Sequence, residues 1–241
     1  MNSGDLLSKA KTAYAATAQQ VGLAVDRFGL LSDEPPPRRQ RLRHWAYSLV
    51  KVHDSLAIAK LDVPWWSYHA IDVVDAWLAA RQRPIRIFEF GSGASTIWLS
   101  RRAEKVHTVE HHKGFWEHIR PTFEARGNID SHLVEPVPSE HPKVPSAKER
   151  HAGLDFANYV ATIDDVGGSF DLIVIDGRAR EACLAASLPH LAADGIIVFD
   201  NSRRRRYRRA IAESGLREER YPGLTPTLPY PEQTSVLRSP G

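Results

Sequence analysis

Residues 87–96 read Ile-Phe-Glu-Phe-Gly-Ser-Gly-Ala-Ser-Thr, and this stretch decides the fold. The first four residues, apolar apart from Glu89, are typical of a buried strand, and Gly91 and Gly93 mark a tight turn that opens a helix. In that order, a strand, a glycine turn and a helix bring backbone N–H groups to the end of the strand, where a ligand can approach closely. The stretch therefore predicts a ligand-binding crevice at the first strand of a sheet.

Short apolar runs alternate with helical segments after this motif. The predicted strands cover residues 85–90, 105–110, 129–134, 170–175, 195–199, 216–221 and about 234–237. The predicted helices cover about 94–103, 113–126, 155–166, 179–191 and 203–214. Strands that are apolar on both faces and separated by helices indicate a parallel sheet covered on both sides. The sequence thus predicts a doubly wound α/β domain.

The segment before residue 63 has helical composition. Helices are expected over 5–28 and about 40–60, and three successive prolines at 35–37 separate them as a linker. Ser67 is expected to cap a helix that runs to about Gln82. We divide the chain into an N-terminal helical arm and linker, residues 1–62, and a Rossmann-like domain, residues 63–241.

The composition is that of a soluble protein, with 42% hydrophobic and 25% charged residues and no apolar run of the roughly 20 residues that a membrane span requires. The single cysteine, Cys183, excludes an internal disulfide framework and favours a reducing, cytoplasmic location. The net charge is only +3, and one basic stretch, residues 203–209, stands out. We therefore expect neither nucleic acid nor a membrane as a partner.

Glu110 ends the second predicted strand, about twenty residues after the glycine turn, where a carboxylate can accept both hydroxyls of a ribose. Together with the glycine turn, it indicates an adenosine-containing cofactor. A dinucleotide fingerprint would place a third glycine at position 96, but this chain has Thr96. A nicotinamide cofactor therefore becomes the alternative rather than the first choice.

Four motifs in register resemble the class I S-adenosylmethionine-dependent methyltransferases. They are Glu89-Phe90-Gly91-Ser92-Gly93, Glu110, the run 171–176 that ends in Asp176, and residues 191–198. The resemblance implies a seven-stranded sheet whose last strand is antiparallel, with the amino-acid end of the cofactor near Gly91 and its ribose on Glu110. The expected cofactor site comprises Glu89, Gly91, Ser92, Gly93, Ser95, Thr96, Glu110, His111 and Asp176.

Asp176 and the pair Asp200-Asn201 end neighbouring predicted strands, so their side chains are expected at the same edge of the sheet. Two carboxylates and an amide oxygen suit Mg²⁺, and the pattern resembles the metal site of the catechol O-methyltransferase group. The chain departs from that group at Arg178, because an arginine cannot replace the group's lysine base. The alternative is that Asp176 binds cofactor or substrate and Asp200-Asn201 caps the next helix.

Asp176, His111 and His112 are the candidate catalytic residues, as groups that could take a proton from the acceptor. The acceptor site is expected to include Trp66, Tyr68, Arg178, Thr225 and Tyr230. One or two arginines of 203–209 are expected near the site as anion ligands, with the rest in water. The proline-rich connection 136–152 is either a lid or a surface excursion.

The sequence as a whole predicts a cytoplasmic enzyme that transfers a methyl group from S-adenosylmethionine to a small molecule, with oxygen as the expected acceptor atom and Mg²⁺ as a candidate cofactor. A nicotinamide-dependent oxidoreductase and a non-catalytic S-adenosylmethionine-binding domain are the alternatives. The N-terminal arm is expected either to cover the pocket or to build a homodimer.

Overall fold

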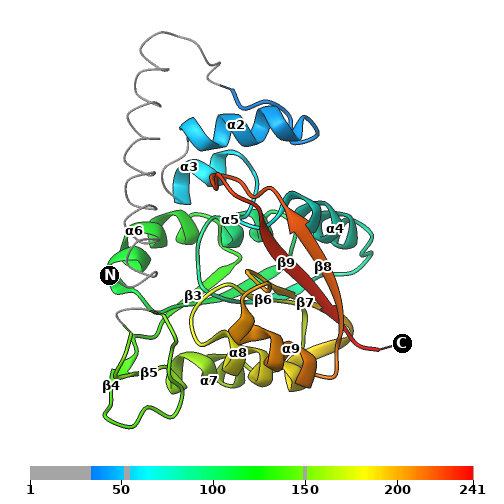
Figure 1. Cartoon of the computed structure of the whole chain (residues 1–241). Helices are drawn as coiled ribbons and strands as arrows, with labels where there is room; N and C mark the ends of the chain where they lie inside the picture. The colour runs from blue at the N-terminus through cyan, green and yellow to red at the C-terminus, as the bar shows by residue number, and fades with distance from the viewer. Residues whose placement is uncertain (1–33, 52–54, 149–150, 241) are drawn as a thin grey trace, which may run out of the picture.

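A seven-stranded sheet runs through the molecule (Figure 1). The computed structural model describes residues 34–51, 55–148 and 151–240. The order across the sheet is β3-β2-β1-β6-β7-β9-β8, and all neighbours are parallel except β9, which runs antiparallel to β7 and β8. The strands are β1 (Arg86–Phe90), β2 (Lys105–Glu110), β3 (Ile129–Leu133), β6 (Phe170–Ile175), β7 (Leu191–Phe199), β8 (Arg217–Gly223) and β9 (Glu232–Arg238). The predicted α/β architecture with an antiparallel last strand is confirmed.

Two layers of helices cover the sheet, one on each face (Figure 1). The first layer holds α2 (Arg41–Lys51), α3 (Ser55–Lys60), α4 (Tyr68–Ala79), α5 (Ala94–Ser100) and α6 (Lys113–Glu124). The second holds α7 (Ala157–Val166), α8 (Arg180–Ser187), the short turn η1 (Leu188–His190), η2 (Arg205–Tyr207) and α9 (Arg208–Glu213). Because both faces are covered, central strands such as β6 are buried along their whole length, which explains why β6 is apolar at every position except Asp171.

Two predicted helices differ in their described extent. The helix expected over 40–60 is seen as α2 and α3, with residues 52–54 between them outside the described residues, and the helix expected over 179–191 ends at Ser187. Pro189 follows that end in a 3₁₀ turn, where its missing N–H and ring prevent a regular α-helix from continuing. The chain then enters β7 at Leu191, four residues earlier than predicted.

The described part of the N-terminal segment packs on the same core as the sheet. Tyr47 of α2 and Ile58 of α3 are buried in the hydrophobic cluster that also holds the first helical layer. Trp45 Nε1 donates to Leu228 O (2.8 Å), which ties α2 to the loop between β8 and β9. The predicted helix over 5–28 lies outside the described residues. None of the described helices combines the length and apolar character needed to cross a bilayer.

The helix α4 begins where the sequence predicts. Ser67 lies in an extended conformation, and its Oγ accepts the N–H of Ala70 (3.3 Å), as an N-cap residue does. The same hydroxyl donates to Tyr221 O in β8 (2.7 Å). One side chain therefore fixes both the start of α4 and its position against the edge of the sheet.

The proline-rich connection 136–152 begins with β4 (Val137–Pro138), which pairs antiparallel with β5 (Leu154–Asp155) just after the connection. The carboxylate of Asp155 accepts the backbone N–H groups of Lys143 (2.8 Å), Val144 (3.0 Å) and Ala157 (2.9 Å). These bonds satisfy loop donors that have no ladder partner. They hold the connection close to the sheet edge at which β1, β2 and β6 end.

Candidate active site

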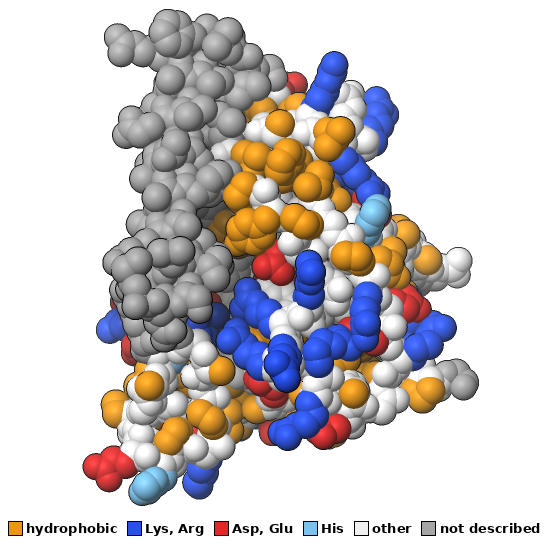
Figure 2. All heavy atoms as spheres, viewed as in Figure 1, with side chains coloured by type: hydrophobic (Ala, Val, Ile, Leu, Met, Phe, Trp, Pro, Cys, Tyr) orange, Lys and Arg blue, Asp and Glu red, His pale blue; other side chains and the backbone are white. Residues whose placement is uncertain are grey.

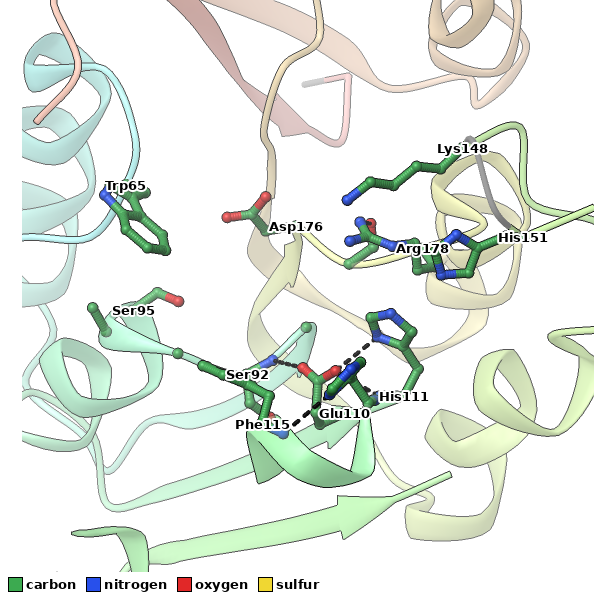
Figure 3. Close-up of a pocket in the computed structure, with 15 residues that line it drawn as sticks. Trp65, Ser92, Ser95, Glu110, His111, Phe115, Lys148, His151, Asp176 and Arg178 are labelled. Carbon is green, nitrogen blue, oxygen red and sulfur yellow. Dashed lines mark hydrogen bonds and ion pairs between the residues drawn. The ribbon is translucent and has the colours of Figure 1, made fainter. Parts of the chain in front are cut away.

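A cavity of about 460 Å³ lies at the carboxyl ends of β1, β2 and β6. This size is typical of a small-molecule or cofactor site. In Figure 3, Trp65 lies at one end of the cavity, Lys148, Arg178 and His151 lie at the other, and Asp176 is between them. The lining residues are Trp65, Gly91, Ser92, Gly93, Ala94, Ser95, Glu110, His111, His112, Phe115, Lys148, His151, Asp176, Gly177 and Arg178.

The glycine turn after β1 touches the loop after β6. Gly91 has φ +98°, and a Cβ built on it would lie 2.7 Å from the Cα of Gly177. A Cβ on Gly177 would lie 2.0 Å from the hydroxyl of the buried Tyr159. Both positions therefore require glycine, Gly91 for its backbone conformation and both for the close approach of the two loops. This contact forms the floor of the cavity.

Glu110 is buried at the end of β2 and binds both neighbouring segments (Figure 3). Its Oε1 accepts the N–H groups of His111 and His112 (both 2.8 Å), and its Oε2 accepts the N–H of Ser92 (3.2 Å). Burial favours the neutral carboxyl, but the hydrogen bonds and charge of His111 and the N–H of His112 outweigh it and lower the pKa of Glu110. A carboxylate is thus fixed at the cavity wall beside the glycine turn.

Glu89 lies beneath the glycine turn and does not line the cavity. Its carboxyl group accepts hydrogen bonds from Ser95 Oγ and Thr96 Oγ1 (both 2.5 Å) and from Thr108 Oγ1 (3.1 Å). Complete burial outweighs these bonds and raises the pKa of Glu89 to about 7. Of the residues expected to bind the cofactor, Glu89 and Thr96 are placed to hold the start of α5, whereas the others all line the cavity.

One buried cation, the guanidinium of Arg180, lies between Asp176 at the end of β6 and Asp200 at the end of β7. Arg180 donates to Asp176 Oδ1 (2.7 Å) and to the backbone oxygen of Asp200 (2.5 Å), and it lies 3.8 Å from the Asp200 carboxylate. Burial raises the pKa of Asp176 despite Arg180, and burial together with the charge of Asp176 raises the pKa of Asp200 to about 7. Thr234 Oγ1 also donates to Asp200 (2.7 Å).

These residues do not fit a magnesium ion. Asp176 lines the cavity described above, Asn201 lines a different one, and Asp200 is buried beneath both. The charge that a divalent cation would neutralise is already met by Arg180. Nowhere in the described chain do three or more His, Cys, Asp or Glu side chains form a candidate metal site. The structure therefore does not support the predicted site at Asp176, Asp200 and Asn201, because the three do not converge on one space.

The two histidines predicted as bases both line the cavity but differ in their surroundings. His112 caps α6, with its Nδ1 accepting the N–H of Phe115 (3.0 Å). His111 places Nδ1 2.7 Å from Glu110 Oε1, and its ring contacts the rings of His151 and Tyr159. The ring of His111 is therefore held by a carboxylate and by aromatic neighbours, whereas the ring of His112 caps the N-terminus of α6.

The structure corrects part of the predicted acceptor site. Trp66 is fully buried against Trp98 with ring centroids 5.9 Å apart, and Tyr68 is buried with its hydroxyl 2.7 Å from His44 Nδ1. Trp66 and Tyr68 therefore both face the core. Trp65, directly before Trp66, points in the opposite direction and reaches the cavity instead.

The β8–β9 loop does not reach the cavity with its predicted residues. Thr225 is buried, and neither Thr225 nor Tyr230 is among the lining residues. Another residue of the loop, Thr227, accepts a hydrogen bond from Trp65 Nε1 (2.7 Å). The loop thus contributes to the cavity by fixing the position of Trp65. Arg178, the remaining residue of the predicted acceptor site, does line the cavity.

Several lining residues carry no motif in the sequence. Lys148 and His151 come from the proline-rich connection, and Phe115 comes from the first turn of α6. The length and proline content of that connection are the only sequence signal for Lys148 and His151, and they do not identify individual residues.

Residues 88–202 match the family Methyltransf_24, which is described as a methyltransferase domain. The match begins in β1 and ends just after Asn201, so it includes the glycine turn, Glu110 and Asp176. This match, together with the fold, supports a class I S-adenosylmethionine-dependent methyltransferase. The predicted choice of a methyltransferase over a nicotinamide oxidoreductase is confirmed, and the weaker similarity to the catechol O-methyltransferase group is not.

Solved structures share the fold of this methyltransferase domain at low sequence identity. Cofactor-bound Rv0187 from MTB aligns with a TM-score of 0.55 at 20% identity, covering 86% of this chain and 98% of that one. Precorrin-6y C5,15-methyltransferase from Geobacter metallireducens aligns with a TM-score of 0.50 at 12% identity, covering 71% and 88%. These likenesses show the fold alone. No curated protein sequence matches the chain.

Proposed function

We propose that this chain binds S-adenosylmethionine in the cavity at the ends of β1, β2 and β6 and methylates a hydroxyl oxygen of a small molecule. The observation that carries the proposal is Glu110: an ionised, buried carboxylate, tied to the glycine turn through the N–H of Ser92. Its Oε1 already accepts two backbone bonds, whereas Oε2 accepts one. Oε2 is therefore the oxygen better placed to accept a ribose hydroxyl.

The glycine turn supports the placement of the amino-acid end of the cofactor. With Gly91 and Gly177 in contact, the chain presents backbone rather than side chains at the cavity floor. Trp65 bounds one end of the same space. Two reactants held side by side in this space would be aligned, and such alignment can account for up to about 7–11 kcal/mol of a bimolecular barrier.

S-adenosylmethionine supplies a methyl group already made electrophilic by its sulfonium, so the chain's own task is alignment and proton transfer. The acceptor oxygen forms a bond to the methyl carbon while the carbon–sulfur bond breaks and its electron pair stays on sulfur. The proton of the hydroxyl goes to Asp176, whose pKa is raised by burial and whose position is fixed by Arg180. An acidic group at this position suits an acceptor that must lose a proton, such as a hydroxyl.

Calorimetric titration of the full chain with S-adenosylhomocysteine, NAD and NADP tests the binding step. We expect saturable binding of S-adenosylhomocysteine and none of either dinucleotide, because the position of the third glycine is filled by Thr96, which donates to Glu89. Tight binding of NAD or NADP without S-adenosylhomocysteine would refute the proposal. Release of tritium-labelled product from S-adenosylmethionine with a panel of hydroxylated compounds then tests the transfer step.

A further inference from the structure

A second cavity, of about 450 Å³, adjoins the proposed cofactor cavity and shares Lys148, Gly177 and Arg178 with it. Its lining is mostly polar and contains five basic residues against the two acidic residues Glu181 and Glu232. The basic residues are Lys148, Arg178, Arg180, Arg204 and Arg206. Figure 2 shows Lys and Arg side chains gathered on the face of the molecule that α8 and α9 occupy in Figure 1.

Three of these arginines have no carboxylate partner among the described residues. Arg180 is paired with Asp176 and Asp200, but Arg178, Arg204 and Arg206 form no ion pair with a described Asp or Glu. Arg178 Nε is buried without a hydrogen-bond acceptor, and Arg178 Nη1 donates only to the backbone oxygen of Gly177 (3.1 Å). Burial and the charge of Arg180 lower the pKa of Arg178 and outweigh the more distant negative charges of Glu110 and Asp176.

Other arginines on the same side of the molecule are matched by carboxylates. Arg208 and Arg220 bind Glu218 (2.6 and 2.8 Å), and Arg217 binds Glu219 (2.6 Å). Arg203 and Arg205, beside the second cavity but outside its lining, also form no ion pair with a described carboxylate, so the unmatched positive charge lies at the second cavity and on the surface next to it. The size of the cavity, about 450 Å³, favours a compact anion over an extended polyanion such as RNA.

We propose that the second cavity binds a phosphate group carried by the methyl acceptor, so that the substrate is a small phosphorylated molecule. Three unpaired guanidinium groups suit a phosphate dianion better than a single carboxylate, because each planar fork can bind two phosphate oxygens. Shared residues at the boundary let one acceptor place its phosphate in the second cavity and its reacting oxygen beside Asp176. This inference rests on the proposed function.

The stretch 203–206 supplies a matched pair of variants. Arg204→Gln/Arg206→Gln removes two charges from the cavity lining, whereas Arg203→Gln/Arg205→Gln removes two charges from exposed side chains that do not line it. Titration of each full-length protein with inorganic phosphate, followed by ³¹P NMR at constant ionic strength, compares them. We expect saturable binding by the parent chain, at least tenfold weaker binding by the first variant, and less than a twofold change in the second.

Three results would overturn the inference. The first is equal weakening by both pairs of substitutions, which would show only a general electrostatic field. The second is displacement of phosphate by benzoate as readily as by phenyl phosphate, which would make the site a carboxylate site. The third is micromolar binding of a 20-nucleotide RNA that both variants weaken alike. Titration with S-adenosylhomocysteine separates the two proposals: if it binds and phosphate does not, only this inference fails, and if neither binds, the proposed function fails as well.

Discussion

Replacing Arg180 by methionine should destabilise the fold by about 3–5 kcal/mol, because it leaves a buried pair of carboxyl groups without their cation. Arg180 is 5% exposed and donates to Asp176 Oδ1 and to three backbone oxygens, those of Asp176 (2.9 Å), Gly177 (3.2 Å) and Asp200 (2.5 Å). Methionine has a similar length but no donors. The free energy of unfolding from urea titrations at pH 8 measures the loss.

The pH dependence of this loss has a definite sign. The pKa of Asp200 is about 7 with Arg180 present, and removing the cation raises the pKa values of Asp200 and Asp176 further above those of the unfolded chain. Groups whose pKa is raised on folding are most favourable to the fold at low pH, and this contribution is lost as the pH rises through the folded value. The destabilisation should therefore be smaller at pH 5.5 than at pH 8.

A second substitution isolates the electrostatic part. Asp200→Asn in the Arg180→Met background removes one of the two uncompensated charges and should recover about 1–3 kcal/mol at pH 8. In the parent chain, the same substitution should destabilise, because it removes the negative charge that faces Arg180 and leaves Thr234 Oγ1 a neutral amide oxygen as its acceptor. A loss below 1 kcal/mol for Arg180→Met, or no recovery in the double variant, would refute the claim that Arg180 replaces a metal between these carboxylates.

Three further substitutions test the framework of the cavity. Glu89→Gln should reduce the fall in unfolding free energy between pH 5 and pH 7.5 by about 2 kcal/mol, since the folded pKa of Glu89 is about 7 and its contribution is lost as the pH rises towards that value; an unchanged pH dependence of the urea midpoint across this range would count against it. Gly177→Ala should lower the free energy of unfolding by about 1–3 kcal/mol, measured by calorimetric melting, because the new Cβ meets the Tyr159 hydroxyl. Tyr159→Phe should restore part of this loss, and a melting temperature equal to that of the parent would contradict the contact. Ser67→Ala should cost about 1 kcal/mol through loss of the α4 cap, and a neutral substitution would show that the cap contributes nothing.

The fold was predictable from the sequence because its signals are local. Short strands buried on both faces, such as β1 and β6, are mostly apolar, and the turn at Gly91 needs a residue that tolerates a positive φ. Helix ends were harder to predict. The α8 helix stops at Ser187 because Pro189 and the pairing of Leu191 with Phe170 compete with it, and the second of these is a long-range contact.

The candidate site was predictable where function depends on the end of a strand, and not where it depends on side-chain direction. Glu110 and Asp176 end their strands, so their place at the cavity follows from topology. Trp65 and Trp66 are adjacent and chemically identical, and only packing against Trp98 decides which one faces the core. The burial of Arg180 and its pairing with two carboxylates could not be predicted either, because the sequence does not distinguish such an arginine from an exposed one on a helix.

The affinity of Glu110→Gln for S-adenosylhomocysteine, measured by isothermal titration calorimetry, tests the binding site most directly. Glutamine keeps one carbonyl oxygen for the N–H groups of His111 and His112 but loses the charge, and a hydrogen bond to a charged group contributes about 1.5–3 kcal/mol. We therefore expect affinity to fall about 10- to 100-fold. Glu117→Gln, at an exposed position on α6 with only a 4.0 Å contact to Lys113, should bind like the parent. Unchanged affinity in Glu110→Gln, with the protein folded, would contradict a ribose site at this carboxylate.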